Sequence, residues 1–314
     1  MHLKHLFIVN PKAGKGIGAI MARRIKELFK NIQEKYPETR YEIVMTEHRG
    51  HATEIARDYS TRGTWRIYAV GGDGTINEVL NGMADSDSSL GCVPAGTGND
   101  FIKYLAGDYE RMDILKETIL GEEELIDVGM VNEQYFLNVA SVGFDAKVNY
   151  KTELYKGKPL ITPLFAYLGG IVGNITDLRP TRVNIKQKNE NRIADVFLLA
   201  VCNGQTYGGG YHIAPMAQIN DGFFDVIEVE PLGLSKLVRY LPKLRKGTHI
   251  GLPEIHHYQT DRIQLTSDEE FIVNLDGETI FSKDVDFRLR AKKIRMVFPR
   301  RIIQKIELED ELEN

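Results

Sequence analysis

Three glycine-rich turns punctuate the first hundred or so residues of this chain, and each one closes a short apolar run. The apolar runs cover residues 6–9, 65–70 and 90–96, a length typical of buried strands. After the first turn, apolar side chains such as Ile25 and Phe29 recur with the period of a helix. Strands that alternate with helices favour a parallel sheet covered by helices. Ligands of such sheets bind beyond the carboxyl ends of the strands, where all three turns fall.

The rest of the first 125 residues continues this alternation. Residues 41–46 form a further strand-like run, and the segments 52–59 and 76–83 each place their apolar residues on one helical face. We therefore predict an N-terminal α/β domain over residues 1–125, with helices on both faces of a parallel sheet.

Beyond about residue 125 the pattern changes to closely spaced strands, several of which alternate apolar and polar residues. Such alternation is typical of antiparallel sheets with one solvated face. It predicts a C-terminal antiparallel β-sandwich domain over residues 126–298. Two helices are predicted inside this domain, at 163–175 and 234–246, and the tail 299–314 is expected either to pack back on the first domain or to fray.

Composition limits the classes of protein to which the chain can belong. A length of 314 residues suits two domains, and 42% hydrophobic with 27% charged residues is an ordinary globular balance. A net charge of −4 gives no reason to expect a nucleic-acid partner. Cys92 and Cys202 lie in apolar strand-like runs, which favours buried reduced thiols. Without a signal-peptide pattern or an apolar membrane span, we expect a soluble, cytoplasmic protein.

The first turn, Asn10-Pro-Lys-Ala-Gly-Lys-Gly16, has a composition suited to phosphate binding. Its glycines let backbone N–H groups approach an anion closely, and Lys12 and Lys15 add positive charge. The spacing matches neither GxxxxGK[ST] nor GxGxxG, so a plain strand-to-helix turn is an equal alternative.

The second turn, Gly71 to Thr75, places Asp73 among three glycines. This arrangement makes sense where the backbone lies against a ligand while Asp73 faces Mg²⁺ or its water shell. A turn with a helix-capping residue is the alternative. The third turn, 94–100, again places small residues, a hydroxyl and the carboxylate of Asp100 at a strand end.

These turns together resemble those of the diacylglycerol kinase catalytic-domain family, especially the soluble bacterial lipid kinases. The matching segments are IVNPKAGKG, TEHRGHA, VGGDGTINEVLNG and PAGTGNDF, followed by NGQTYGGGYHIAP, INDGFFDV and LDGE. They run in the family's order from residue 8 to residue 278. GGDGT alone is shared with NAD kinases and 6-phosphofructokinases, whereas NDF and LDGE favour the lipid kinases.

The resemblance implies that ATP binds in a cleft between a nucleotide-binding α/β domain and a β-sandwich domain. The residues implied to contact ATP are Asn10, Lys15, Thr46, Gly72, Asp73, Gly74, Thr75, Asn77, Glu78 and Thr97. Asp73, Asp100 and Asp127 are implied to organise the catalytic Mg²⁺ and its waters. For Asp127 a simple turn-forming role is the alternative.

Two short motifs of the predicted second domain complete the implied site. The resemblance implies a structural Mg²⁺ bound by the Asp221 carboxylate and by the backbone carbonyls of Gln218 and Phe223, although an Asn-Asp-Gly hairpin needs no ligand. It also implies that Glu278 of LDGE is the general base, since a lipid alcohol is a weak nucleophile that must lose its proton. Asp276 is the competing candidate, as a supporting or turn residue.

The segment 234–246 indicates how the protein could reach a lipid substrate. Five basic residues are interleaved with Leu and Val: Lys236, Arg239, Lys243, Arg245 and Lys246. A basic amphipathic helix of this kind can lie on anionic headgroups at the inner face of a membrane. A solvated face over an apolar stripe is the alternative, and Pro242 counts against a continuous helix.

Three functions fit the sequence. We favour an ATP- and magnesium-dependent kinase of a lipid hydroxyl, with diacylglycerol as the default substrate and sphingoid bases, phosphatidylglycerol and undecaprenol as alternatives. A kinase of a soluble substrate such as NAD, and a non-catalytic nucleotide or lipid sensor, are the competing hypotheses. The retained Asp73, Asp100, Asp221 and Glu278 count against the sensor. A homodimer is compatible with an edge strand of the β-rich domain.

Overall fold

The computed structural model describes residues 4–107, 110–155, 179–188 and 190–300, which fall into two compact units. Unit 1 contains residues up to Asp127 together with the chain from Ala291, and unit 2 contains Val128–Arg290. The helix predicted at 163–175 and most of the predicted tail lie outside the described residues.

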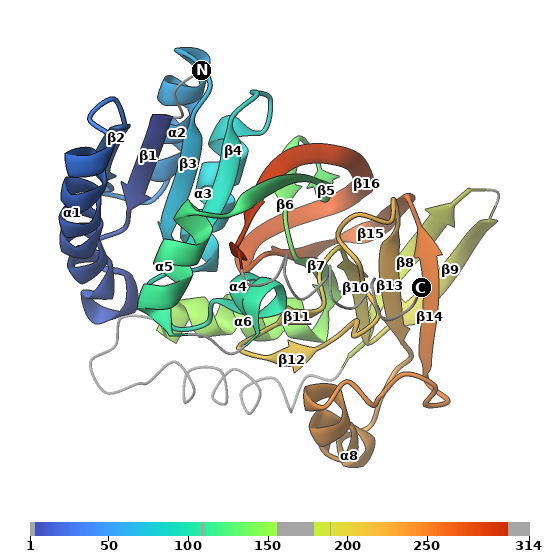
Figure 1. Ribbon diagram of the computed structural model, residues 1–314. Helices are drawn as coiled ribbons and strands as arrows, with labels where there is room; N and C mark the ends of the chain where they lie inside the picture. Colours follow the sequence, from blue (N-terminus) through green and yellow to red (C-terminus); the bar gives the residue numbers. More distant parts are fainter. Residues whose placement is uncertain (1–3, 108–109, 156–178, 189, 301–314) are drawn as a thin grey trace, which may run out of the picture. The chain divides into compact units, whose positions relative to one another are not determined.

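Unit 1 is built on a parallel sheet with the strand order β2-β1-β3-β4-β16 (Figure 1). Every neighbouring pair in this order is parallel, as predicted from the alternation of strands and helices. The strands are β1 (Lys4–Val9), β2 (Arg40–Met45), β3 (Arg66–Gly71), β4 (Ser89–Pro94) and the last residues of β16 (Glu278–Phe298).

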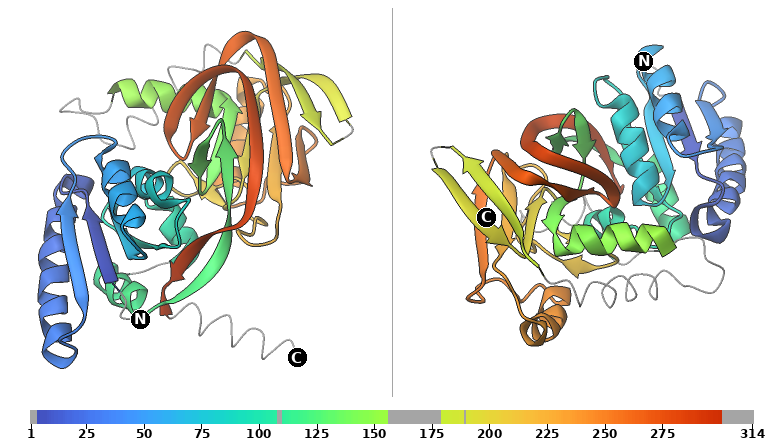
Figure 2. Two further views of the ribbon diagram at one scale, coloured as in Figure 1. Left: turned by 90° about the horizontal axis from the view of Figure 1, so that it is seen from above. Right: turned by 180° about the vertical axis from the view of Figure 1, so that it is seen from behind.

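Helices cover both faces of this sheet (Figure 2). Phe7 and Tyr68 of the sheet pack in one buried cluster with Ile25 and Phe29 of α1 and Leu115 of α5. The alternate sheet residues are buried on the opposite face, against α2 and α3. The helices of the unit are η1 (Ala13–Lys15), α1 (Ile17–Lys35), α2 (His51–Thr61), α3 (Asp73–Met83), α4 (Asp100–Ala106) and α5 (Arg111–Ile119).

The end of β16 belongs to unit 1, whereas the sequence placed residues up to 298 in the second domain. The reason is pairing: Arg295 lies opposite Ser89 in a parallel ladder with β4. The composition of residues 291–298 is that of any strand, so the sequence alone does not reveal its partner. The first unit therefore gains a strand from the far end of the chain.

Unit 2 is predominantly antiparallel, with the strand order β14-β13-β10-β7-β15-β16 and with β8 and β9 attached through β15. The predicted fold class, a helix-covered parallel sheet followed by antiparallel sandwich strands, is confirmed. The strands are β5 (Glu122–Val131, entering from unit 1), β6 (Gln134–Phe136), β7 (Val139–Gly143), β8 (Thr181–Gln187), β9 (Glu190–Val196), β10 (Leu198–Cys202), β11 (Thr206–Tyr207), β12 (Tyr211–His212), β13 (Phe224–Val229), β14 (Ile255–Thr260) and β15 (Arg262–Leu275).

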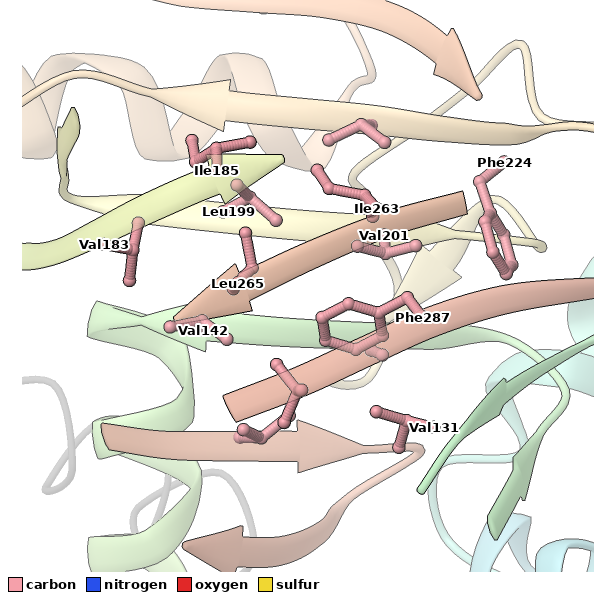
Figure 3. Close-up of a cluster of buried hydrophobic side chains, with 14 of the residues drawn as sticks. Val131, Val142, Val183, Ile185, Leu199, Val201, Phe224, Ile263, Leu265 and Phe287 are labelled. Atoms are coloured by element: carbon pink, nitrogen blue, oxygen red, sulfur yellow. The ribbon is translucent and has the colours of Figure 1, made fainter. Parts of the chain in front are cut away.

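Strand β15 pairs with different strands along its two halves. Its register with β16 shifts between Thr266 and Phe271, so that its first half pairs with β8 and its second half with β7. Irregular pairing of this kind bends a strand. Figure 3 shows the apolar cluster that results, with Leu265 of β15 near Leu199 and Phe287 from neighbouring strands.

Two helices accompany the strands of unit 2. Helix α6 (Phe144–Tyr155) begins directly after β7, and α8 (Leu234–Arg245) follows β13. The helix predicted at 234–246 is therefore present, and Pro242 lies inside it without ending it. In the described part of the chain no helix has the length and apolar character needed to cross a bilayer.

Candidate active site

The strand-end turns of unit 1 are joined to one another by backbone hydrogen bonds. The N–H of Asn10 donates to the carbonyl of Val70 at 3.0 Å, and the N–H groups of Ala95 and Gly96 donate to the carbonyl of Gly71 at 2.8 and 3.0 Å. Because β1, β3 and β4 are adjacent and parallel, their carboxyl ends meet at one edge of the sheet. The structure therefore brings together the three turns that the sequence singled out.

Close backbone packing explains the glycines between β3 and β4. A Cβ atom on Gly96 would lie 2.5 Å from the Cα atom of Gly72, a separation that real Cβ atoms do not tolerate. The two turns therefore touch through their backbones. A larger residue at position 96 would separate the turns and displace the residues that follow them.

Asp73 and Asp100 begin the two helices that follow these turns. Asp73 is the first residue of α3, and its carboxylate accepts the N–H groups of Asp100 and Phe101, each at 3.2 Å. Burial raises the pKa of Asp73, and the neighbouring Asp100 raises it further, while the backbone donors act in the opposite direction. The fold thus holds one carboxylate beside another, an arrangement that a bound cation would relieve.

Asn99 supports this arrangement with an unusual backbone conformation. It lies immediately before α4 at φ 52°, in the left-handed region, and is buried. Its side-chain amide donates to the carbonyl of Gly96 at 3.1 Å. Left-handed non-glycine residues cost free energy and cluster at functional sites. The left-handed conformation of Asn99 sets the direction in which α4 begins at Asp100.

The other predicted nucleotide-contacting residues of unit 1 lie along the same edge. The side-chain amide N–H of Asn10 donates to the Thr75 hydroxyl at 3.4 Å, and the side-chain Oδ1 of Asn10 accepts the N–H of Lys12 at 3.1 Å. Thr46 directly follows β2 and donates its N–H to the last residue of β1, Val9. The remaining members of the predicted set on these turns are Lys15 in η1, Gly72, Gly74, Asn77 and Thr97.

Glu78 has a structural task in addition to any contact with nucleotide. Its two carboxylate oxygens accept the N–H groups of Gly50 and Ala52 at 3.0 and 3.1 Å, and its backbone carbonyl accepts the Thr53 hydroxyl. These bonds satisfy the exposed donors at the start of α2. Glu78 therefore ties α2 to α3, and its predicted contact with ATP stays a prediction.

Asp127 is the last residue of unit 1 before the chain enters unit 2. It is buried, and its carboxylate accepts the N–H of Lys292 at 2.7 Å, where the chain has just returned to unit 1. The contact fastens the outgoing and returning strands together. This role differs from the turn-forming alternative, because Asp127 lies within β5, and the metal role of Asp127 stays a prediction.

In unit 2 the LDGE motif forms the turn between β15 and β16. Asp276 occupies the left-handed region at φ 50°, and its carboxylate accepts the N–H groups of residues 137, 138 and 139 at 2.6, 3.0 and 3.0 Å. Glu278 is the first residue of β16, stands opposite Leu275 in the ladder and is partly exposed. Asp276 is thus the anchor of the turn that carries Glu278, as the competing interpretation proposed.

Asn149 of α6 holds the other side of the same turn and was missed by the sequence analysis. Its amide donates to the carbonyl of Gly277 at 3.0 Å and approaches the side-chain oxygens of Asn274 and Thr279, both at 3.3 Å. The side-chain oxygen of Asn274 in turn accepts the N–H of Gly277 at 2.9 Å. The position of this polar residue on the inner face of a helix is the sequence signal that could have identified it.

Asp145, an acidic residue, was also missed by the sequence analysis. It lies in the first turn of α6 and is buried. Burial raises the pKa of this carboxyl to about 7, against the opposing influence of Ser141, Tyr207 and nearby backbone donors. The strand-end rule that identified Asp73 also applies here, because Asp145 follows the buried strand β7 by two residues.

The predicted structural metal site centres on the turn before β13. Asp221 accepts the N–H of Phe223 at 3.0 Å, a bond that Asp commonly makes within a turn. Gln218 and Phe223 are exposed. Across the described residues no group of three or more His, Cys, Asp or Glu side chains could hold a metal ion, so a site here would depend mainly on backbone carbonyls. The structural Mg²⁺ stays a prediction.

Comparisons with known proteins identify the family. Residues 4–131 match the family model "Diacylglycerol kinase catalytic domain", and residues 138–298 match "YegS C-terminal NAD kinase beta sandwich-like domain". The chain is 32% identical over 307 residues to a diacylglycerol kinase of Bacillus subtilis, covering 96% of this chain and 98% of that protein. The chain belongs to the diacylglycerol kinase family. The resemblance inferred from the motifs is therefore confirmed.

Other members of this family are similar over most of their length. A diacylglycerol kinase of Staphylococcus saprophyticus is 30% identical over 88% of this chain and 90% of its own, and a probable lipid kinase YegS-like of Chromohalobacter salexigens is 30% identical over 75% and 76%. The crystal structure of a diacylglycerol kinase from Bacillus anthracis superimposes with a TM-score of 0.68 at 22% identity, covering 95% of this chain and 98% of that one. That structure supports the fold.

Proposed function

We propose that this member of the family transfers the γ-phosphoryl group of ATP to a hydroxyl of diacylglycerol or a closely related lipid, with Mg²⁺ bound at the ends of β3 and β4. The observation that carries the proposal is the contact of Asp73 with the first turn of α4, which holds two carboxylates beside glycine-rich turns at one sheet edge. The curated relatives named diacylglycerol kinase give the reaction class.

The residues at this edge fit a divalent cation. Mg²⁺ prefers oxygen ligands and is commonly bound by one or two carboxylates together with water and substrate phosphates. Asp73 and Asp100 supply such carboxylates, and burial together with the neighbouring Asp100 raises the pKa of Asp73. When bound, the cation would neutralise charge on the phosphates during transfer.

The chain's own residues would bind and orient the nucleotide. Backbone N–H groups of the glycine-rich turns and the start of α3 favour phosphate oxygens. Asn10 and Thr75, already linked by a hydrogen bond, offer polar side chains beside them. Lys15 would add a cation to the same anion-binding turn.

Glu278 would accept the proton of the lipid hydroxyl. A carboxylate within hydrogen-bond reach of the reacting oxygen can remove its proton as the phosphoryl group departs from ATP. The turn that carries Glu278 is held on one side by Asp276 and on the other by Asn149, so its position is well defined within unit 2. We propose that Glu278 is the general base of the transfer.

The test is Glu278→Gln, assayed with ATP against diacylglycerol, a sphingoid base, phosphatidylglycerol, undecaprenol and NAD. We expect wild-type turnover on diacylglycerol and a loss of roughly 10²–10⁴-fold in the variant, the range for removing a general base. ATP binding should be unchanged. Glu270→Gln, an exposed glutamate of β15, is the matched control and should keep full activity. Full turnover by Glu278→Gln would show that Glu278 is not the general base. Activity of the wild type on NAD alone would show that the acceptor is a soluble molecule and not a lipid.

A further inference from the structure

Helix α8 presents two different faces, one packed and one exposed. Leu237, Tyr240, Leu241 and Leu244 pack against the second apolar cluster of unit 2, which includes Ile213. The remaining positions point away from that cluster. In Figures 1 and 2 the helix lies at the margin of unit 2, beyond the ends of β13 and β14.

The exposed face carries apolar side chains that the core does not use. Leu234 is 43% exposed and Val238 is 59% exposed, and Pro242 is exposed one further turn along. Positions four apart lie above one another on a helix, so these three form a continuous stripe. None of the three belongs to the apolar cluster on which the opposite face of α8 packs.

Positive charge flanks this stripe. Arg239, Lys243 and Lys246 are exposed on the adjoining part of the helix surface. The helix contains no acidic residue, in a chain whose net charge is −4. The other two cations have neighbours in unit 2, since Lys236 pairs with Glu254 and Arg245 lies over the ring of Tyr211 at 5.5 Å.

We propose that the exposed face of α8, defined as Leu234, Val238, Pro242, Arg239, Lys243 and Lys246, docks on an anionic lipid bilayer. An apolar stripe beside a basic one is the pattern of helices that lie in the interface plane of membranes. Charge complementarity selects a bilayer rich in anionic headgroups over a neutral one, because each basic residue near such a surface favours binding by about five-fold. Its link to turnover rests on the proposed function, whereas the binding itself does not.

The experiment measures cosedimentation of the full chain with vesicles of phosphatidylglycerol and phosphatidylcholine, and with phosphatidylcholine alone. Wild type should bind only the anionic vesicles, and added salt should weaken this binding. Arg239→Gln/Lys243→Gln/Lys246→Gln should reduce partitioning about 100-fold, from about five-fold per residue. Leu234→Ser/Val238→Ser should weaken binding several-fold while keeping its salt dependence. All five positions are exposed, so folding should be retained, as checked by thermal unfolding.

The matched control removes three exposed cations from α1 in unit 1, Arg23→Gln/Lys26→Gln/Lys30→Gln, and should bind vesicles like wild type. Equal losses in both triple variants, unchanged binding of the α8 variant, or no binding by wild type would each overturn the proposal. Activity separates it from the proposed function. With short-chain diacylglycerol in detergent micelles the α8 variant should equal wild type, and only its activity on vesicles should fall. Vesicle binding that depends on α8 without any lipid kinase activity would retain the docking surface and reject the kinase.

Discussion

Asp73 in unit 1 and Asp276 in unit 2 are both carboxylates at turns, but their hydrogen bonds differ in number and length. Each carboxylate accepts backbone N–H groups from a segment distant in sequence. Asp73 accepts two, from residues 100 and 101, at 3.2 Å, whereas Asp276 accepts three, from residues 137 to 139, at 2.6 to 3.0 Å. One of the two residues that donate to Asp73, Asp100, itself carries a carboxylate that raises the pKa of Asp73. The residues that donate to Asp276 lead into and begin strand β7.

The difference distinguishes a carboxylate that we propose binds a ligand from one whose acceptor positions are occupied by backbone donors. An ionised carboxylate has about four acceptor positions. Asp276 uses most of them on backbone donors, and so it fixes a turn. Asp73 accepts its two distant donors at the longer distance of 3.2 Å, and burial followed by the neighbouring Asp100 raises its pKa. The comparison predicts that mutation of Asp73 acts on catalysis and mutation of Asp276 acts on stability.

The largest expected effect comes from Asp73→Asn. We expect activity to fall about 10²–10³-fold, the scale for losing one strong electrostatic contact to the transition state. Because folding raises the pKa of Asp73, wild type loses stability as pH rises through that pKa. The neutral asparagine avoids this loss, so the variant should unfold at a higher temperature than wild type at pH 7 to 8, with the difference vanishing in acid.

Thermal unfolding and kinase assays on the same preparations test this prediction. Asp87→Asn, an exposed position in the same unit, serves as the control and should change neither quantity. A destabilised Asp73→Asn at neutral pH would show that the Asp73 carboxylate belongs to the fold in the way that Asp276 does.

Asp276→Ala should give the opposite pattern. Three backbone N–H groups lose a charged acceptor at once, so we expect the free energy of unfolding to fall by about 3–4 kcal/mol. Denaturant titration followed by a probe in unit 2 measures this loss. Nucleotide binding by unit 1 should persist in mild conditions. Wild-type stability together with lost activity would instead assign Asp276 a direct role in the reaction.

Asp145 tests whether a raised carboxyl pKa is confined to the strand ends of unit 1. Its pKa of about 7 in the folded protein exceeds that of an unfolded aspartate, so the stabilising protonated form is lost as pH rises through 7. Wild type should therefore lose about 2–3 kcal/mol of stability between pH 5 and pH 8 that Asp145→Asn does not lose. Parallel pH profiles for the two proteins would contradict the burial-driven shift.

The smallest expected effect belongs to Asn149. Asn149→Ala removes the donor to Gly277 and the contacts with Asn274 and Thr279, and should lower kcat by about 10-fold with little change in KM for ATP, since about 1–2 kcal/mol is typical of such bonds. Lys147→Gln on the same helix is the control. An unchanged kcat would show that Asp276 alone holds the turn of Glu278.

Motif and periodicity predicted more of unit 1 than of unit 2. The turns at 71–75 and 94–100 were recognised because parallel strands must deliver their carboxyl ends to one edge, a rule that needs no coordinates. The anchoring partners of Asp276, 137 residues and more away in sequence, follow no local rule. Asn149 was missed because a polar residue in a helix is ordinarily exposed. Asp145 follows the buried strand β7 and could have been recognised by the strand-end rule.

The sequence by itself determined the family, the alternation of strands and helices in the first unit and the residues at its strand ends, because these depend on spacing along the chain. Only the tertiary structure decided that residues 291–298 complete the sheet of unit 1, that Glu78 caps α2 and that Asp276 grips the approach to β7. Those pairings join segments far apart in the chain, and hydrogen-bond geometry selects them among many chemically equivalent partners.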